Sequence, residues 1–118
     1  ISAAIASHSL WKKHLADAIE TGRFDQTPEY VRDSGNCRFG KWLDEVPDRL
    51  RDDAFRYVFD THRAFHVEAS EILDLALSGK KEESLARLAK GSAYAKISVS
   101  LIMAIAGWRA VNKHTLDP

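Results

Sequence analysis

Apolar side chains recur every three or four residues over most of the chain, which is the period of an amphipathic α-helix. The first such stretch runs from Ile1 to about Glu20, and its apolar stripe contains Ile5, His8, Trp11, Leu15 and Ile19. Charged residues such as Lys12 and Asp17 fall on the opposite side. Gly22 fits the residue just past the end of this helix, because glycine adopts left-handed backbone angles at little cost.

The chain then becomes irregular and carries its single cysteine. Thr27 followed by Pro28 predicts the start of a short helix, with the threonine as N-cap. A break at 33–36 precedes the segment Cys37-Arg38-Phe39-Gly40-Lys41-Trp42-Leu43, in which Phe39, Trp42 and Leu43 are apolar anchors. The glycines two residues before and three residues after Cys37 predict a backbone that turns tightly around the sulfur.

Two longer helical patterns follow. Pro47 and Asp48 predict the start of a helix that ends at Ser78, with Gly79 just past its end. Its core-facing positions are Val58, Phe65, Ala69, Ile72, Leu73 and Ala76. The last helix is predicted over 82–111, with a bend or a place of close helix approach at Gly91-Ser92. Its core stripe is predicted as Leu85, Leu88, Ala95, Val99, Ile102 and Ala106.

The stretch 101–108 is apolar on every side, which predicts that a second surface covers it. That surface is either a partner subunit or another part of a longer protein. No segment has the alternating pattern of a strand, so we expect an all-α fold. It should be an antiparallel four-helix bundle, with a short Cys-bearing helical or loop insert between the first and second long helices. We expect residues 1–118 to form one domain. Because the sequence begins at Ile1, part-way through a helical pattern, we expect it to be a fragment of a longer protein.

Composition narrows the functional classes. Lys plus Arg and Asp plus Glu number 17 each, so no basic surface is offered to nucleic acid. No secretory signal is present, and the longest uncharged run, 97–108, is too short to cross a bilayer. One cysteine excludes an internal disulfide and suits a reducing compartment. These features predict a cytoplasmic domain that binds neither nucleic acid nor membrane.

The candidate chemistry is a metal site. His62 and His66 are four residues apart, so on a helix both imidazoles lie on one face, one turn apart. His8 lies on the inner face of the first helix, and Cys37 lies on the insert between them. Three imidazoles and one thiolate are the ligands that tetrahedral Zn²⁺ takes, and soft sulfur disfavours Mg²⁺ or Ca²⁺. Four protein ligands leave no position for an activated water, so we expect no enzymatic activity.

Other interpretations stay open at this point. Each histidine alone is more often a hydrogen-bonded core residue, and a free cysteine is often a buried, inert hydrophobe. The chain would then be a metal-free structural or dimerisation bundle. A di-iron site of hemerythrin type needs inward carboxylates, and Glu68, Glu71 and Asp74 lie near the histidine pair. However, the sequence lacks the helical His–Glu spacing that such a site uses.

Three motifs resemble those of the chemoreceptor zinc-binding (CZB) domain family. They are His8-Ser9-Leu10-Trp11-Lys12, the segment from Cys37 to Leu43, and His62-Arg63-Ala64-Phe65-His66. The resemblance implies a four-helix-bundle domain of bacterial cytoplasmic sensors that binds zinc through three His and one Cys. The ligand roles then fall on His8, Cys37, His62 and His66, whereas His14 and His114 match no motif position.

The resemblance also implies a regulatory role. Members of this family are attached to chemoreceptors or to enzymes that make cyclic di-GMP, and some are linked to sensing zinc or oxidants such as hypochlorous acid. We therefore expect a sensory domain that signals to an attached output module, a chemoreceptor in chemotaxis by preference and a diguanylate cyclase as the alternative. Cys37 is the redox-reactive candidate, because a metal-bound thiolate is the form that oxidants attack. A homodimer is expected from the apolar stretches at 1–6 and 101–108.

Overall fold

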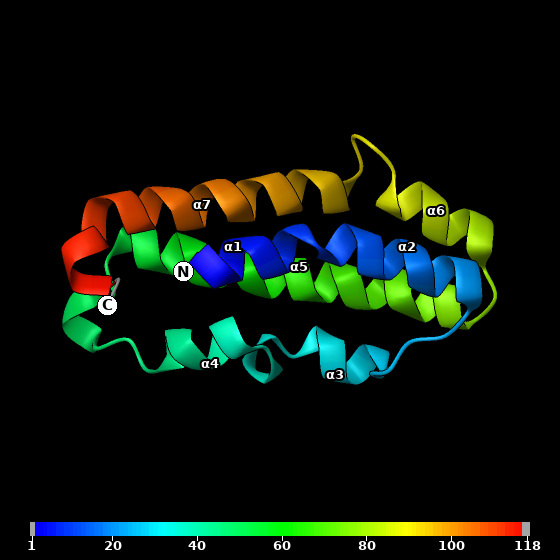
Figure 1. The fold of residues 1–118 in the computed structure, drawn as a ribbon, viewed down its shortest axis with the longest axis horizontal. Helices are drawn as coiled ribbons and strands as arrows, with labels where there is room; N and C mark the ends of the chain where they lie inside the picture. Colours follow the sequence, from blue (N-terminus) through cyan, green and yellow to red (C-terminus); the bar gives the residue numbers. More distant parts are fainter. Residues whose placement is uncertain (1, 117–118) are drawn as a thin grey trace.

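The computed structural model describes the backbone of residues 2–116 and the side chains of residues 3–110 and 112. Every regular element in this described part is helical. The all-α prediction is therefore confirmed, and the arrangement is compatible with a helical bundle. Figure 1 shows an elongated molecule in which the chain passes along the long axis four times, reversing direction at each end.

The first pass is almost continuously helical, whereas the second is broken into short helical pieces (Figure 1). The first consists of α1 (Ser2–Ser9) and α2 (Trp11–Thr21), which lie end to end. The second is made of short pieces, namely α3 (Pro28–Arg32), the 3-10 helix η1 (Ser34–Asn36) and α4 (Arg38–Asp44). The second pass therefore presents more loop backbone to the interior than a continuous helix would.

The last two passes contain the longest helices. After the 3-10 helix η2 (Asp48–Leu50), α5 (Asp53–Leu77) forms the third pass, and α6 (Lys81–Leu88) with α7 (Ala93–Leu116) forms the fourth. The helix α5 packs against α2, α3, α6 and α7, so it lies at the centre of the fold. Its predicted core positions are all buried: Val58, Phe65, Ala69, Ile72, Leu73 and Ala76.

Helix ends in the first half follow their predicted signals. Gly22 has φ 71°, and its N–H donates to the Ala18 carbonyl at 2.7 Å, which closes α2. Thr27 accepts a hydrogen bond from the Tyr30 N–H, with Pro28 as the first residue of α3. Leu15 and Ile19 are buried on the inner face of α2, as their spacing predicts. The sequence therefore correctly places the faces that the first pass turns inward.

The predicted start of α5 at Asp48 is wrong. Residues 48–50 form a separate 3-10 turn, and Arg51 leaves helical geometry with ψ 68°. The helix begins five residues later, because the Asp52 carboxylate accepts a hydrogen bond from the Phe55 N–H at 2.9 Å and caps it. An aspartate at this position satisfies an N–H that has no partner within the helix.

The end of α5 is a Schellman motif. Gly79 has φ 78°, and the Lys80 N–H donates to the Leu75 carbonyl at 3.0 Å. The Gly79 N–H donates to the Ala76 carbonyl, which completes the pattern. Glycine at 79 is required here because a left-handed residue with a Cβ atom costs about 1 kcal/mol or more.

The predicted core stripe of the last helix is also wrong. Val99 is 59% exposed and Leu85 is 45% exposed. Of the predicted stripe Leu88 is buried, but the other buried apolar side chains of α6 and α7 are Tyr94, Leu101, Ile105 and Trp108, which the prediction left out. The helix does not merely bend at Gly91; it stops after Leu88 and restarts at Ala93, with Gly91 at φ 80°. The prediction continued one helical spacing from Leu85 to Ala106. Because the helix is interrupted between Leu88 and Ala93, that spacing does not identify the buried face of α7. The apolar stretch 101–108 is therefore not buried all round, and Met103 is 69% exposed.

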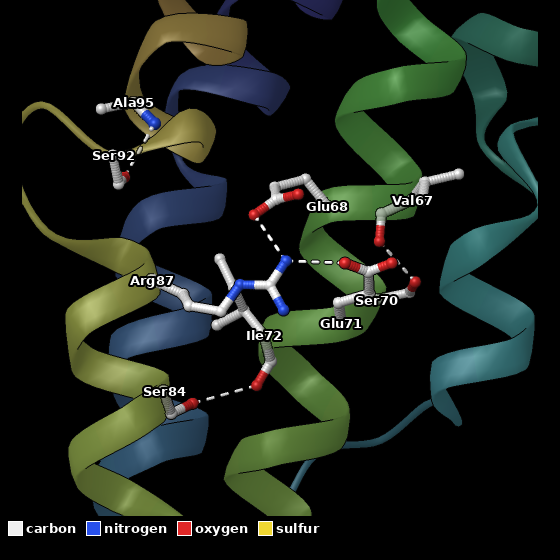
Figure 2. A network of polar contacts seen from close by, with 9 residues as sticks. All are labelled: Val67, Glu68, Ser70, Glu71, Ile72, Ser84, Arg87, Ser92 and Ala95. Carbon is white, nitrogen blue, oxygen red and sulfur yellow. Dashed lines mark hydrogen bonds and ion pairs between the residues drawn. The ribbon is translucent and has the colours of Figure 1, made fainter.

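Ion pairs and a hydrogen bond connect α6 to α5 (Figure 2). The Arg87 guanidinium donates to carboxylate oxygens of Glu68 at 2.8 Å and Glu71 at 2.6 Å. These two acceptors raise the pKa of Arg87 above its usual value. The fully buried Ser84 hydroxyl donates to the Ile72 carbonyl at 3.0 Å. Two of the three carboxylates considered for a di-iron site, Glu68 and Glu71, thus bind an arginine, which removes their support for such a site.

By length and composition alone, the stretch 81–110 could cross a membrane, because an 18-residue window within it has a mean hydropathy of 1.2. From the sequence we expected no segment long enough to cross a bilayer, because only runs without charged residues were considered. This finding corrects that expectation. One such stretch is weak evidence, since helices of soluble proteins pass the same test. The helix break between Leu88 and Ala93 and the charges of Lys96 and Arg109 also weaken it.

Candidate metal centre

His8 is held in one orientation by its own helix. It lies on the inner face of α1 and is 1% exposed. Its Nδ1 is 2.7 Å from the Ala4 carbonyl oxygen, one helical turn earlier. A carbonyl only accepts, so Nδ1 carries the proton and donates. The other ring nitrogen, Nε2, therefore presents a lone pair to the interior.

The two histidines of α5 point at the same place. His62 and His66 are 1% and 3% exposed, and their Nε2 atoms lie 3.1 Å apart. The Nδ1 of His66 donates to the Val31 carbonyl at the end of α3, at 2.8 Å. This bond fixes the same tautomer as in His8, with the Nε2 lone pair directed inward. The shortness of α3 matters here, because a longer helix would use the Val31 carbonyl for its own hydrogen bonding.

Cys37 reaches the histidines from the junction of η1 and α4. It has extended backbone angles, φ −82° and ψ 143°, and it precedes the first residue of α4. Its Sγ lies 3.8 Å from the Nε2 of His8. The side chain is partly exposed, in contrast to the three buried imidazoles. Cys37 is thus the member of the group nearest to solvent.

The glycines beside Cys37 do not act as predicted. Neither Gly35 nor Gly40 has a positive φ, so neither provides a left-handed turn around the sulfur. Gly40 lies within α4, where a Cβ atom would overlap the Ser34 carbonyl oxygen and lie 3.3 Å from Cε1 of His62. Glycine at 40 is needed because α4 packs directly on the backbone of η1 and on an imidazole ring.

Aromatic rings surround the imidazoles. Phe39 makes edge contacts with His8 and His62, with ring centroids 5.9 and 5.1 Å apart. Phe65 contacts His8 in the same way from α5, and Trp11 contacts His66. Such packing limits rotation of the rings and keeps the local dielectric low.

Four donor atoms converge, one each from His8, Cys37, His62 and His66, and all lie within 4.8 Å of one another. The Nε2 of His62 is 3.1 Å from the Nε2 of His8 and also 3.1 Å from that of His66. With zinc–nitrogen bonds near ~2.0 Å and zinc–sulfur bonds near ~2.3 Å, a tetrahedral site has edges of about 3.3 Å between nitrogens and about 3.5 Å between nitrogen and sulfur. Three separations, two of 3.1 Å between nitrogens and one of 3.8 Å between nitrogen and sulfur, are close to these edges, so the donor set fits a tetrahedral cation.

The electrostatics of the group favour neutral imidazoles. Burial lowers the pKa of His62 to about 2, with further lowering by His66 and His8. Burial also lowers the pKa of His66 to about 4 and that of His8 below its usual value. Neutral rings with inward lone pairs repel one another unless a cation or proton lies between them. A divalent metal ion satisfies all of them at once.

All four sequence-predicted site residues are therefore brought together. His14 is exposed, in agreement with its lack of a motif position, and the side chain of His114 lies outside the described residues. Sequence reasoning missed the carbonyls of Ala4 and Val31, which orient two of the rings. A backbone carbonyl cannot be recognised as an acceptor from the residue type. However, Ala4 precedes His8 by four residues, and on a helix this spacing lets a side chain reach the carbonyl one turn earlier.

The chain was also compared with known proteins. No curated protein and no solved structure matches it. Residues 8–73, more than half of the chain, match the family model described as "Chemoreceptor zinc-binding domain". This range begins at His8 and includes Cys37, His62 and His66, so it contains all four members of the convergent group. The chain thus belongs to the chemoreceptor zinc-binding domain family.

Proposed function

We propose that this chain is a zinc-binding sensory domain in which His8, Cys37, His62 and His66 hold one Zn²⁺ ion. The observation that carries the proposal is the convergence of three imidazole nitrogens and one sulfur within 4.8 Å, from segments up to 58 residues apart (8 to 66). The family match supports zinc over other metals. Bound in a closed shell, the ion would supply folding energy on the order of 10 kcal/mol rather than hydrolytic chemistry.

Cys37 is the proposed sensor residue within this site. A neighbouring cation keeps the sulfur as a thiolate, which is the nucleophilic form of cysteine. Hypochlorous acid would transfer its OH to the thiolate, giving sulfenic acid, while chloride leaves with the electron pair of the broken O–Cl bond. Sulfenic acid is a weaker ligand than thiolate. The segment from η1 to α4 would then lose its attachment to the buried histidines.

The wider role that we propose follows the family. The domain would act in the bacterial cytoplasm as a non-enzymatic four-helix bundle with antiparallel helices and a Cys-bearing insert. It would pass a change in zinc or oxidation state to an attached output module, a chemoreceptor by preference and a diguanylate cyclase as the alternative. It would contact neither nucleic acid nor membrane.

A homodimer is part of the same proposal. Val99 and Met103 are 59% and 69% exposed and one turn apart on α7, so they present an apolar surface. A second copy of the chain would cover it. Sedimentation analysis of the Met103→Glu variant checks this idea. We expect a dimer for the parent chain and a monomer for the variant; a monomeric parent chain would rule the dimer out.

Metal analysis of protein purified without chelators tests the site. We expect about one zinc per chain, and less than about one tenth of an equivalent after His66→Ala, because a lost ligand opens the closed shell. His14→Ala is the matched control, since His14 is an exposed histidine outside the group. A parent chain that contains almost no zinc would support the metal-free bundle instead.

Oxidant response tests the role of Cys37. Zinc release on titration with hypochlorous acid should be rapid in the parent chain. The Cys37→Ser variant, with a poorer oxygen ligand, should bind zinc more weakly and show no oxidant-dependent release. If Cys37→Ser retains zinc and still releases it on oxidation, the cysteine-sensor proposal fails, although zinc binding itself stands.

A further inference from the structure

The buried histidines raise the question of how an ion reaches them. Two surface pockets touch the group, and residues of η1 line both of them. One, of ≈ 180 Å³, has Cys37 and His66 in its wall, together with Ser7, Trp11 and Arg38. The other, of ≈ 210 Å³, has His62 in its wall, together with Gly40, Asp44 and Arg63.

Packed main chain borders the pocket beside His62. A Cβ atom on Gly40 would lie 3.3 Å from Cε1 of His62, the ring carbon bonded to Nε2. The same Cβ would overlap the Ser34 carbonyl oxygen. The backbone of α4 and η1 therefore lies directly against this side of the ring. Only one of the four group members lines this pocket, whereas two line the pocket beside Cys37.

The pocket beside Cys37 has the opposite character. Two of the four group members line it, and one of them, Cys37, is the partly exposed member. The wall also contains polar residues, among them Asn36, whose side chain donates to the Tyr30 carbonyl at 3.0 Å. Oxygen and sulfur atoms along this wall can replace water molecules of a hydrated cation one at a time.

We propose that the pocket lined by Ser7, Trp11, Arg38 and Cys37 is the route by which Zn²⁺ enters and leaves the site, with Cys37 as the first ligand gained and the first lost. This inference rests on the proposed zinc function and extends it to the kinetics of exchange. Arg38 and Asp33 bring opposite charges to this pocket, and the positive charge of Arg38 slows an approaching cation. A residue that is not a ligand thus influences the exchange rate.

Filling each pocket separately tests the route. Ser7→Phe places an aromatic ring in the pocket beside Cys37, and Asp44→Phe does the same in the pocket beside His62. Zinc uptake and transfer to a chromophoric chelator are followed by stopped flow, and zinc content is measured on the same samples. We expect Ser7→Phe to slow uptake and release equally, by about tenfold, with the equilibrium affinity unchanged, because a plug raises the same barrier in both directions. Asp44→Phe should leave both rates within about twofold of the parent chain.

Two arginine substitutions, one beside each pocket, provide a second test that perturbs packing less. Arg38→Gln should speed zinc uptake by about threefold at low ionic strength, with the effect vanishing at high salt. Arg63→Gln removes a charge beside the other pocket, where Arg63 lies over the Phe59 ring, and should leave uptake unchanged. Equal effects of the two arginine variants, or a plug at Asp44 that slows exchange as much as one at Ser7, would overturn the route. A parent chain without zinc would instead overturn the proposed function.

Discussion

Gly40→Ala is the substitution whose effect the structure defines most directly. Alanine has a higher helix propensity than glycine, and residue 40 lies inside α4, so local structure alone predicts stabilisation by about 1 kcal/mol. The tertiary structure predicts the opposite sign. The added methyl carbon would overlap the carbonyl oxygen of Ser34 and press on the ring of His62.

The magnitude follows from what can move. Forcing a methyl group into a packed site costs about 1–3 kcal/mol, and the upper value applies here because the obstructing atom is backbone. Subtracting about 1 kcal/mol of helix propensity leaves a net loss of about 2 kcal/mol in the free energy of unfolding. The overlap with the Ser34 carbonyl oxygen can be relieved if η1 shifts away from α4. The Cys37 N–H donates to the same Ser34 carbonyl at 3.3 Å, so that shift also displaces the cysteine.

Urea unfolding followed by far-UV circular dichroism, with and without chelator, measures this loss. Competition with a chromophoric chelator measures the zinc affinity, which we expect to fall by more than tenfold, equivalent to about 1.4 kcal/mol. Gly107→Ala is the matched control. Gly107 is also a helical glycine, in α7, but a Cβ atom there meets no atom within 4 Å. That variant should gain up to about 1 kcal/mol of stability and keep its zinc affinity.

The reasoning would be refuted if Gly40→Ala were as stable as Gly107→Ala. It would also be refuted in part if stability fell while zinc affinity stayed unchanged. The second result would mean that η1 absorbs the strain without moving Cys37.

Two further predictions concern the metal-free chain and the attachment of α6. Because the pKa of His66 is lowered from 6.5 to about 4 and that of His62 to about 2, the unfolded state binds more protons than the folded state below pH 6.5. Chelator-treated protein should therefore lose stability as the pH falls from 6.5 toward 4, by about 2 kcal/mol at pH 5 for His66 alone, in thermal melts across that range; constant stability would contradict this. Ser84→Ala removes a buried hydrogen bond to the Ile72 carbonyl and should cost about 1 kcal/mol in urea unfolding. Ser9→Ala removes an exposed hydrogen bond of similar length and should cost almost nothing, so equal losses would refute the role of burial.

The amino-acid sequence alone determined the features that depend on local chemistry. Helical period placed His8, His62 and His66 on inward faces, and all three are buried. The glycines at 22 and 79 ended helices because left-handed backbone angles are local properties of single residues. The number and kind of metal-binding side chains also predicted a group suited to a metal ion, since donor preference belongs to the side chain itself.

Tertiary structure decided the features that depend on which atoms meet. The inward face of α7 was mispredicted, because the break after Leu88 reset a register that the period had carried across. The sequence could not show that Gly40 is needed for close packing. Its contacts with Ser34 and His62 arise from the tertiary fold and not from the local sequence. Likewise, the Val31 carbonyl orients His66 from 35 residues away. Distances between remote segments arise from how helices pack, and no pattern within one segment encodes them.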